Sequence, residues 1–229
     1  MPSRKRKKPT KFKNIPKVNH RALWPLVILV GILWFVYRAL FSFSVFFDET
    51  IGKAIFFGFP VWLYLSVSNF SQITESLSLK KMHKGMLLGI AYGGIYGFAA
   101  AITAYGLNKS GVQAADLFVS SAFWWEFFLA LLTAFWETIF FFSFIMLSLE
   151  NKMKKWSLTK LVIVTALIFA VFHTPNAILR FDLSMVLYQV ILMFIFGLGQ
   201  ALLFSKEKNA YALMISHAIW GMVLLVHWG

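Results

Sequence analysis

Glu137, His173 and His217 lie inside three separate apolar segments of the chain, and their side chains could carry out hydrolysis. Placing a charged side chain at the centre of a bilayer costs roughly 2.5–3.5 kcal/mol on insertion scales, so such residues usually mark a functional site. A glutamate can act as the general base on a water molecule, while one histidine orients it and the other donates to an oxyanion. Two histidines and a glutamate are also a ligand set of catalytic zinc sites.

These three residues are predicted to lie at a similar depth in the membrane. Counted from the cytoplasmic ends of their segments, Glu137, His173 and His217 lie at roughly 20, 22 and 14 Å, in a hydrocarbon core of about 30 Å. A single intramembrane histidine commonly serves as a hydrogen-bond partner between helices. Three ionisable residues at one level favour a functional site instead.

The composition predicts the fold that must position these residues. Of the 229 residues, 59% are hydrophobic, and apolar runs of about 20 residues recur along the chain. Each run is long enough to cross a bilayer as a helix. The ten-residue alternation of spanning β-strands is absent. We therefore expect an all-α, polytopic transmembrane bundle of about seven spans. With no cysteine, the chain has no disulfide, no thiol nucleophile and no cysteine-ligated metal.

Basic residues in the connections predict the orientation of the spans. Lysine clusters follow every second span, on the side of the basic N-terminus, while the alternate connections hold only Lys53, Lys109 and Arg180. By the positive-inside rule, the N-terminus is cytoplasmic. Arg38, within the first span, is expected to be paired or to reach the interface. The predicted spans are 23–46, 53–70, 86–107, 118–149, 158–180, 183–204 and 209–227.

The first 22 residues form a basic tail that holds nine of the 22 lysines and arginines. Such a tail suits nucleic acid or anionic lipid headgroups. Because an apolar segment follows directly, we expect a disordered cytoplasmic tail that contacts anionic headgroups, with no specific nucleic-acid partner. Residues 23–229 then form the transmembrane domain.

From Glu137 onward, the sequence resembles the CPBP family of intramembrane proteases, which includes the CAAX prenyl endopeptidases and the Abi proteins. The family motifs are EExxxR, FxxxH and HxxxN or HxxxD. Residues 169–173, Phe-Ala-Val-Phe-His, match the second motif, and His217 begins the third. The glycine-rich run at 196–204 resembles the family segment that leads into it. The CPBP-like core is expected over about 118–229.

Three positions depart from these motifs. Thr138 stands in place of the second glutamate, Phe142 in place of the arginine and Gly221 in place of the closing asparagine or aspartate. The resemblance implies that Glu137 and His173 activate water and that His217 stabilises the oxyanion. Asn176, one helical turn beyond His173, is a hypothetical replacement for the missing donor.

The resemblance therefore implies an intramembrane endopeptidase that cleaves a membrane-embedded or lipid-modified protein or peptide. A glutamate mechanism without a cofactor is favoured, and zinc bound by Glu137, His173 and His217 is the alternative. The lost motif residues suggest a second reading, a catalytically weakened relative that acts as a membrane binding or immunity protein. We expect an integral membrane protein of a bacterial or archaeal plasma membrane.

Overall fold

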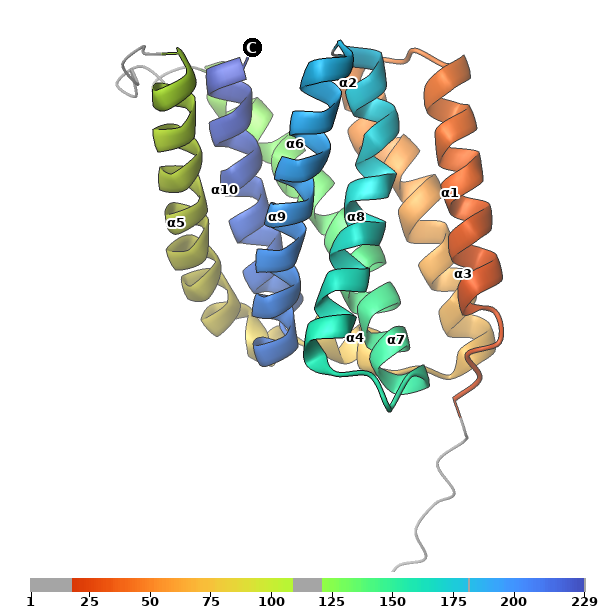
Figure 1. Ribbon diagram of the computed structural model, residues 1–229. Coiled ribbons are helices and arrows are strands. Elements are labelled where there is room, and N and C mark those ends of the chain that lie inside the picture. Colours follow the sequence, from red (N-terminus) through yellow and green to blue (C-terminus); the bar gives the residue numbers. More distant parts are fainter. Residues whose placement is uncertain (1–17, 109–120, 181, 229) are drawn as a thin grey trace, which may run out of the picture.

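The computed structural model describes residues 18–108, 121–180 and 182–228, and in these ranges it contains helices and no strands. Long helices stand side by side in a bundle (Figure 1). This confirms the predicted all-α class. Most of the predicted tail, residues 1–17, and the connection at 109–120 lie outside the described residues. The bounds of the long single helices are α1 Leu23–Leu40, α5 Met82–Asn108, α8 Leu158–Arg180, α9 Leu183–Glu207 and α10 Ala210–Trp228.

Two further spans are composite, because each contains π-helical turns. The second span runs through α2 Val45–Phe47, η1 Asp48–Gly52, η2 Ala54–Gly58 and α3 Phe59–Ser68. The fourth runs through α6 Ser121–Glu137, η4 Thr138–Met146 and α7 Leu147–Lys152. Well under 1% of residues in soluble proteins are π-helical, and π-turns occur frequently at functional sites. Both composite spans are therefore candidates to contribute residues to a functional site.

Five helical segments of the described chain are long and apolar enough to cross a bilayer: 23–40, 45–68, 123–152, 158–179 and 185–207. The remaining two predicted spans correspond to α5 and α10, which are helices of 27 and 19 residues. The start of α1, the short helix α4 Gln72–Ser76 and α7 lie at one end of the bundle, and the C-terminus lies at the other (Figure 1). This arrangement agrees with the predicted alternation of the connections.

The predicted start of the second span, residue 53, is wrong. The span begins at Val45, so Lys53 lies inside it rather than in the preceding connection. A hydropathy scale assigns a lysine the cost of burying its charge without a partner, so a count on that scale places the lysine in a solvated loop. In the folded chain, Lys53 is buried and paired with two carboxylates, which offsets that cost.

The core of the bundle is aromatic and is built around η4. Phe140, Phe141, Phe142 and Phe144 are all fully buried. Phe142, which occupies the motif position of the arginine, packs against Phe169 and Phe204 in neighbouring helices. The replacement is therefore accommodated by apolar packing and leaves no unpaired charge at that position.

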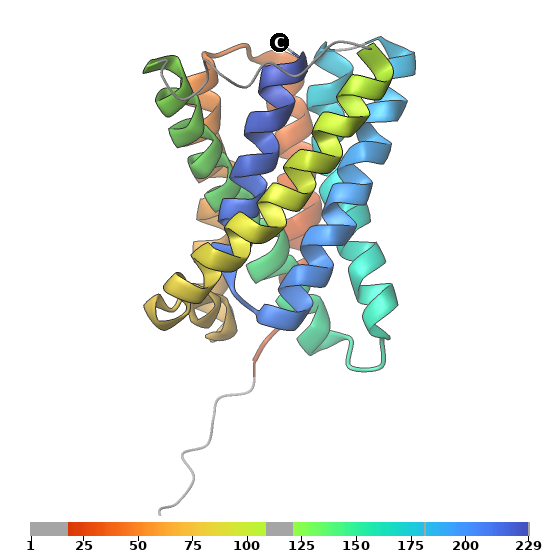
Figure 2. The same cartoon turned by 90° about the vertical axis from the view of Figure 1, so that its left-hand side faces the viewer.

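Glycines set the contact between α5 and α10. Gly85, Gly89 and Gly93 recur every four residues on the face of α5 that meets α10, and α5 crosses α10 obliquely in Figure 2. A Cβ atom on Gly89 would lie 2.5 Å from Cβ of Ile215. Small residues at this spacing let two membrane helices approach closely. The approach fixes α10, which carries His217.

Candidate active site

Glu137 is the last residue of α6, directly before the π-turns of η4, and only 3% of its surface is exposed. An ionised carboxylate in such a place needs partners, because the bilayer core supplies no water. The structure provides them from three other helical segments. One carboxylate oxygen, Oε1, meets an ammonium group, and the other, Oε2, meets two imidazoles.

His173 on α8 and His217 on α10 point the same nitrogen at the same oxygen. The Nε2 atoms lie 3.2 Å and 3.5 Å, respectively, from Oε2 of Glu137. The three predicted site residues, which are widely separated along the chain, therefore meet at one point. The counts of helical depth predicted a common level for the three residues. The packing of the helices brings their side chains into contact at that level.

The second nitrogen of His173 determines what the first can do. Nδ1 lies 2.8 Å from the carbonyl oxygen of Phe169. A carbonyl oxygen can only accept a hydrogen bond, so Nδ1 carries a proton. In the neutral ring, Nε2 is then an unprotonated acceptor that faces the carboxylate. A neutral His173 can thus accept a hydrogen from a water molecule that Glu137 also binds.

Helix α8 is held near His173 by a bond from the first span. The indole Nε1 of Trp34 donates a 3.0 Å hydrogen bond to the carbonyl of Phe172. Pro175 lies inside α8 and, lacking an N–H, cannot complete the helical hydrogen-bond ladder in this turn. The Trp34 bond therefore fixes the backbone beside His173 where the helix itself is weakest.

His217 is positioned by its neighbours on α9. Gln200 Nε2 donates a 3.0 Å bond to the hydroxyl of Ser216, which connects α9 to α10 one residue before His217. The ring of Phe196 lies 5.0 Å from the imidazole, measured between centroids. Nδ1 of His217 is buried and has no hydrogen-bond partner in the described part of the chain. Gln200 thus bridges two helices and orients the segment that carries the imidazole.

Lys53 is the site residue that the sequence interpretation missed. Its ammonium Nζ lies 2.7 Å from Oε1 of Glu137 and 2.5 Å from Oε2 of Glu49. Glu49 also accepts a hydrogen bond from Thr133 on α6. The spacing of Glu49 and Lys53, one helical turn apart, was the available signal. The predicted boundary hid it, because it left Glu49 in the connection and put Lys53 at the very edge of the span.

Asn176 and Glu126 take no part in these contacts. Asn176 follows His173 by one turn, but its Oδ1 is buried and has no hydrogen-bond partner among the described residues. Glu126, on the outer part of α6, is exposed. Arg38 forms an ion pair with Asp48, which confirms the expectation that this arginine is paired. The Arg38–Asp48 pair, on the first two spans, is another charge pair and is partly buried.

The donor set fits a bound metal ion poorly. In the described residues, no group of three or more histidine and carboxylate side chains has the arrangement to hold one. The oxygen that faces the histidines belongs to a carboxylate whose other oxygen already binds the Lys53 ammonium. A divalent cation there would be close to that positive charge, which disfavours binding. No catalytic step is therefore assigned to a metal.

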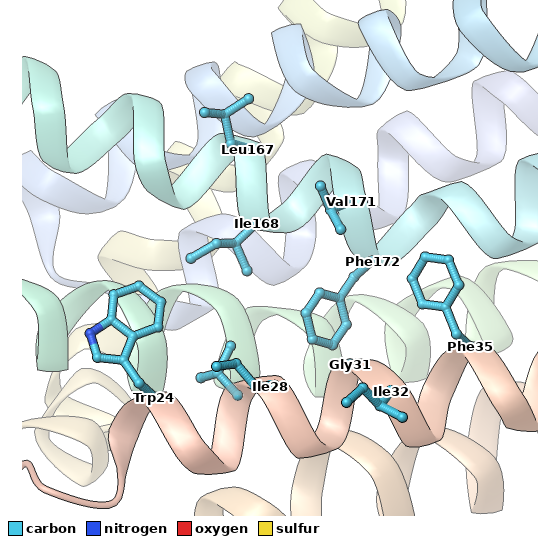
Figure 3. A pocket seen from close by; sticks show the side chains of 10 residues that line it. Trp24, Ile28, Gly31, Ile32, Phe35, Leu167, Ile168, Val171 and Phe172 are labelled. Carbon is cyan, nitrogen blue, oxygen red and sulfur yellow. The ribbon is translucent and has the colours of Figure 1, made fainter.

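An apolar groove of about 400 Å³ lies on another face of α8, against α1 (Figure 3). Phe172 forms part of its wall and separates it from the aromatic residues around the site, packing on Phe57 and Phe141. The groove is lined by Trp24, Val27, Ile28, Gly31, Ile32, Phe35, Leu167, Ile168, Val171 and Phe172. No lining side chain has a carboxylate, an imidazole or a hydroxyl. Any hydrolytic chemistry belongs to the other face of α8, which carries His173.

Comparison with known protein families supports the motif-based resemblance. Residues 119–223, a little less than half of the chain, match the family model described as type II CAAX prenyl endopeptidase Rce1-like. This region resembles the CAAX proteases. No curated protein and no solved structure matches the chain in the same comparisons.

The Rce1-like region, residues 119–223, contains Glu137, His173 and His217 but neither Lys53 nor Glu49. Its family is one of intramembrane proteases, and the apolar helices identify the chain as an integral membrane protein. The ammonium that contacts Glu137 therefore comes from a part of the chain that the family model does not cover.

Proposed function

We propose that this protein is an intramembrane endopeptidase in which Glu137 is the general base. The observation that supports this proposal is that the Nε2 atoms of His173 and His217 both face Oε2 of Glu137 in a buried site. A carboxylate and two imidazoles that converge on one point can activate water and stabilise an oxyanion without further groups. The resemblance of residues 119–223 to the CAAX proteases supports the same reaction.

In the proposed reaction, a water molecule is held by Oε2 of Glu137 and by the unprotonated Nε2 of His173. The water oxygen attacks the peptide carbonyl carbon while one water proton passes to Oε2. The resulting oxyanion accepts a hydrogen bond from Nε2–H of His217. The C–N bond then breaks, and Glu137 returns its proton to the leaving amine, which regenerates the carboxylate.

We propose the glutamate mechanism rather than zinc catalysis. The ammonium of Lys53, 2.7 Å from Glu137, gives this carboxylate a counter-charge that a metal ligand does not need. In the zinc alternative, Glu137 would serve as a ligand and could not act as the base. Asn176 remains a hypothetical second oxyanion donor through its Nδ2 amide, because Oδ1, which has no hydrogen-bond partner among the described residues, can only accept.

The proposed substrate is a membrane-embedded or lipid-modified protein or peptide, cleaved near its membrane end. The buried position of Glu137 within a transmembrane helix favours substrates that already lie in the bilayer. The basic tail is proposed to contact anionic headgroups. We also propose a bacterial or archaeal plasma membrane as the location.

A second candidate function, a membrane binding or immunity protein without proteolysis, is favoured by one observation. Oε1 of Glu137 is occupied by Lys53, and Thr138 and Phe142 replace the second glutamate and the arginine of the family motif. A carboxylate held in an ion pair is a weaker base than a free one. Only a direct assay of cleavage separates the two functions.

The test is proteolysis of a membrane-protein substrate library by the purified protein in liposomes. Glu137→Gln and His173→Ala are compared with Glu126→Gln, which removes an exposed carboxylate from the same helix. We expect cleavage by the wild type and by Glu126→Gln, no cleavage by the two site variants, and full activity after chelation. Loss on chelation with rescue by zinc would establish a metalloprotease. A folded wild type that cleaves nothing would favour the binding function.

A further inference from the structure

A buried cation links two π-helical regions of the molecule. Lys53 stands between η1 and η2 on the second span, and Glu137 directly precedes η4 on the fourth. The two residues are 84 positions apart, and Lys53 is only 4% exposed. π-turns shift the direction of the side chains that follow them relative to a regular helix. Here the irregular turns accompany the contact between Lys53 and Glu137.

The pairing gives the two oxygens of Glu137 different surroundings. Lys53 binds Oε1 at 2.7 Å, while Oε2 faces the histidines and has no hydrogen bond from the described residues. Without the ammonium, the carboxylate could rotate about its terminal torsion, which is broad and roughly two-fold. The ion pair therefore fixes the plane of the carboxylate, with one oxygen at Lys53 and the other facing His173 and His217.

Lys53 is itself held by a second carboxylate. Glu49, one turn earlier, binds Nζ at 2.5 Å and accepts a hydrogen bond from Thr133, four residues before Glu137 on α6. With neutral histidines, the group Glu49, Lys53 and Glu137 carries a net charge of −1. One carboxylate charge thus remains uncompensated after Lys53 is counted, and the Oε2 side of Glu137 is the side that faces no cation.

We propose that Lys53 is a positioning residue of the active site, which orients the Glu137 carboxylate so that Oε2 is presented to water. It supplies from the second span the cation that the helix of Glu137 lacks. Glu49 and Thr133 hold the ammonium in place. This inference rests on the proposed proteolytic function for its kinetic consequences, but not for the contact itself.

The experiment measures kcat, KM and thermal unfolding in liposomes for the wild type, Lys53→Met, Lys53→Arg and Arg38→Met. Arg38→Met is the matched control, because Arg38 forms a partly buried pair with Asp48 that does not include Glu137. Misplacement of a reacting group can cost about 100-fold in rate. We expect Lys53→Met to lower kcat about 100-fold with KM nearly unchanged, and Lys53→Arg to restore most of kcat.

A purely structural role predicts a different pattern. Lys53→Met and Arg38→Met would then lose activity only in proportion to the unfolded fraction, and folded Lys53→Met would keep the wild-type kcat. A wild-type kcat in folded Lys53→Met would overturn the proposal. The proposal is also overturned if Lys53→Arg is as inactive as Lys53→Met while both are folded.

An infrared measurement separates this inference from the proposed function. The carboxylate stretching band of Glu137 is assigned as the band lost in Glu137→Gln and is then compared between the wild type and Lys53→Met. A shifted band in Lys53→Met, with no shift in Arg38→Met, supports the orientation by Lys53 even if the wild type cleaves no substrate. An unshifted band overturns it, whatever the protease assay gives.

Discussion

The two helices that carry the histidines are held in different ways. Helix α10, with His217, lies against α5 through Gly85, Gly89 and Gly93, where an added Cβ atom would collide with α10. Helix α8, with His173, has an open apolar groove of about 400 Å³ between itself and α1, and it contains Pro175. One histidine is therefore fixed by close backbone packing. The other lies on a helix that packs closely against α9, where a Cβ atom on Gly197 would lie 3.3 Å from Cα of Ala166, but that meets α1 across the groove and through the Trp34 bond.

This difference matches the roles proposed for the two imidazoles. An oxyanion donor works best when it is preorganised and does not move during the reaction. A residue that exchanges hydrogen bonds with water tolerates more adjustment of its helix. The comparison predicts that substitutions against α10 act mainly on stability, whereas those around α8 act on the position of His173.

The largest effect is expected for His173→Ala. Loss of a residue that takes part in general acid–base catalysis lowers the rate by about 10²–10⁴-fold, or roughly 3–5 kcal/mol in the barrier. The measurement is kcat on a cleaved membrane substrate, with the folded fraction determined by thermal unfolding. Activity within tenfold of the wild type would show that Glu137 works without His173.

His217→Ala is expected to have a somewhat smaller effect. Removing one oxyanion donor costs about 10²–10³-fold in kcat. KM should change little, because the donor acts on the transition state and not on the bound peptide. A rise in KM with an unchanged kcat would instead assign His217 to substrate binding.

Gly89→Ala tests the close packing of α10. The new Cβ would lie 2.5 Å from Cβ of Ile215, and overpacking of this kind costs about 1–3 kcal/mol. Thermal unfolding in detergent measures the loss. Gly94→Ala is the matched control, since nothing lies within 4 Å of its Cβ position on the same helix. Equal stability of the two variants would contradict the close contact between α5 and α10.

Trp34→Phe tests the support of α8. The indole ring is largely replaced, but the 3.0 Å bond to the Phe172 carbonyl is lost, at a cost of about 1 kcal/mol. We expect kcat to fall as well, because this bond fixes the turn that carries His173. Trp62→Phe, a change at an exposed tryptophan on α3, serves as the control. Unchanged stability and activity of Trp34→Phe would refute the assigned support.

The smallest effect is expected for Gly31→Ala, on the face of α1 that lines the groove against α8. The nearest atom to the new Cβ is the ring carbon Cζ of Phe172, at 3.3 Å, and a ring beside an open groove can shift. The change in unfolding free energy should stay within about 0.5 kcal/mol. A loss as large as that of Gly89→Ala would mean that α1 and α8 pack as tightly as α5 and α10.

Much of the candidate site could be predicted from single residues. A glutamate or histidine inside an apolar segment is identified by its own cost of burial, and the FxxxH motif places His173. Helical depth then predicted a common level for Glu137, His173 and His217. Lys53 could not be found in this way, because its charge near the predicted end of a span is also typical of a loop. Its partners lie on its own helix and 84 residues away.

By itself, the sequence determined a helical membrane bundle, the three ionisable residues inside it and the resemblance to the CAAX proteases, because hydropathy and short motifs are local properties. The tertiary structure alone decided that Lys53 enters the membrane, that it binds one oxygen of Glu137 and that the histidines share the other. It also decided that Asn176 Oδ1 stays without a hydrogen-bond partner among the described residues. The physical reason is that the cost of burying a charge depends on whether a neighbouring helix supplies an opposite charge. Only the packed bundle brings the two charged side chains together.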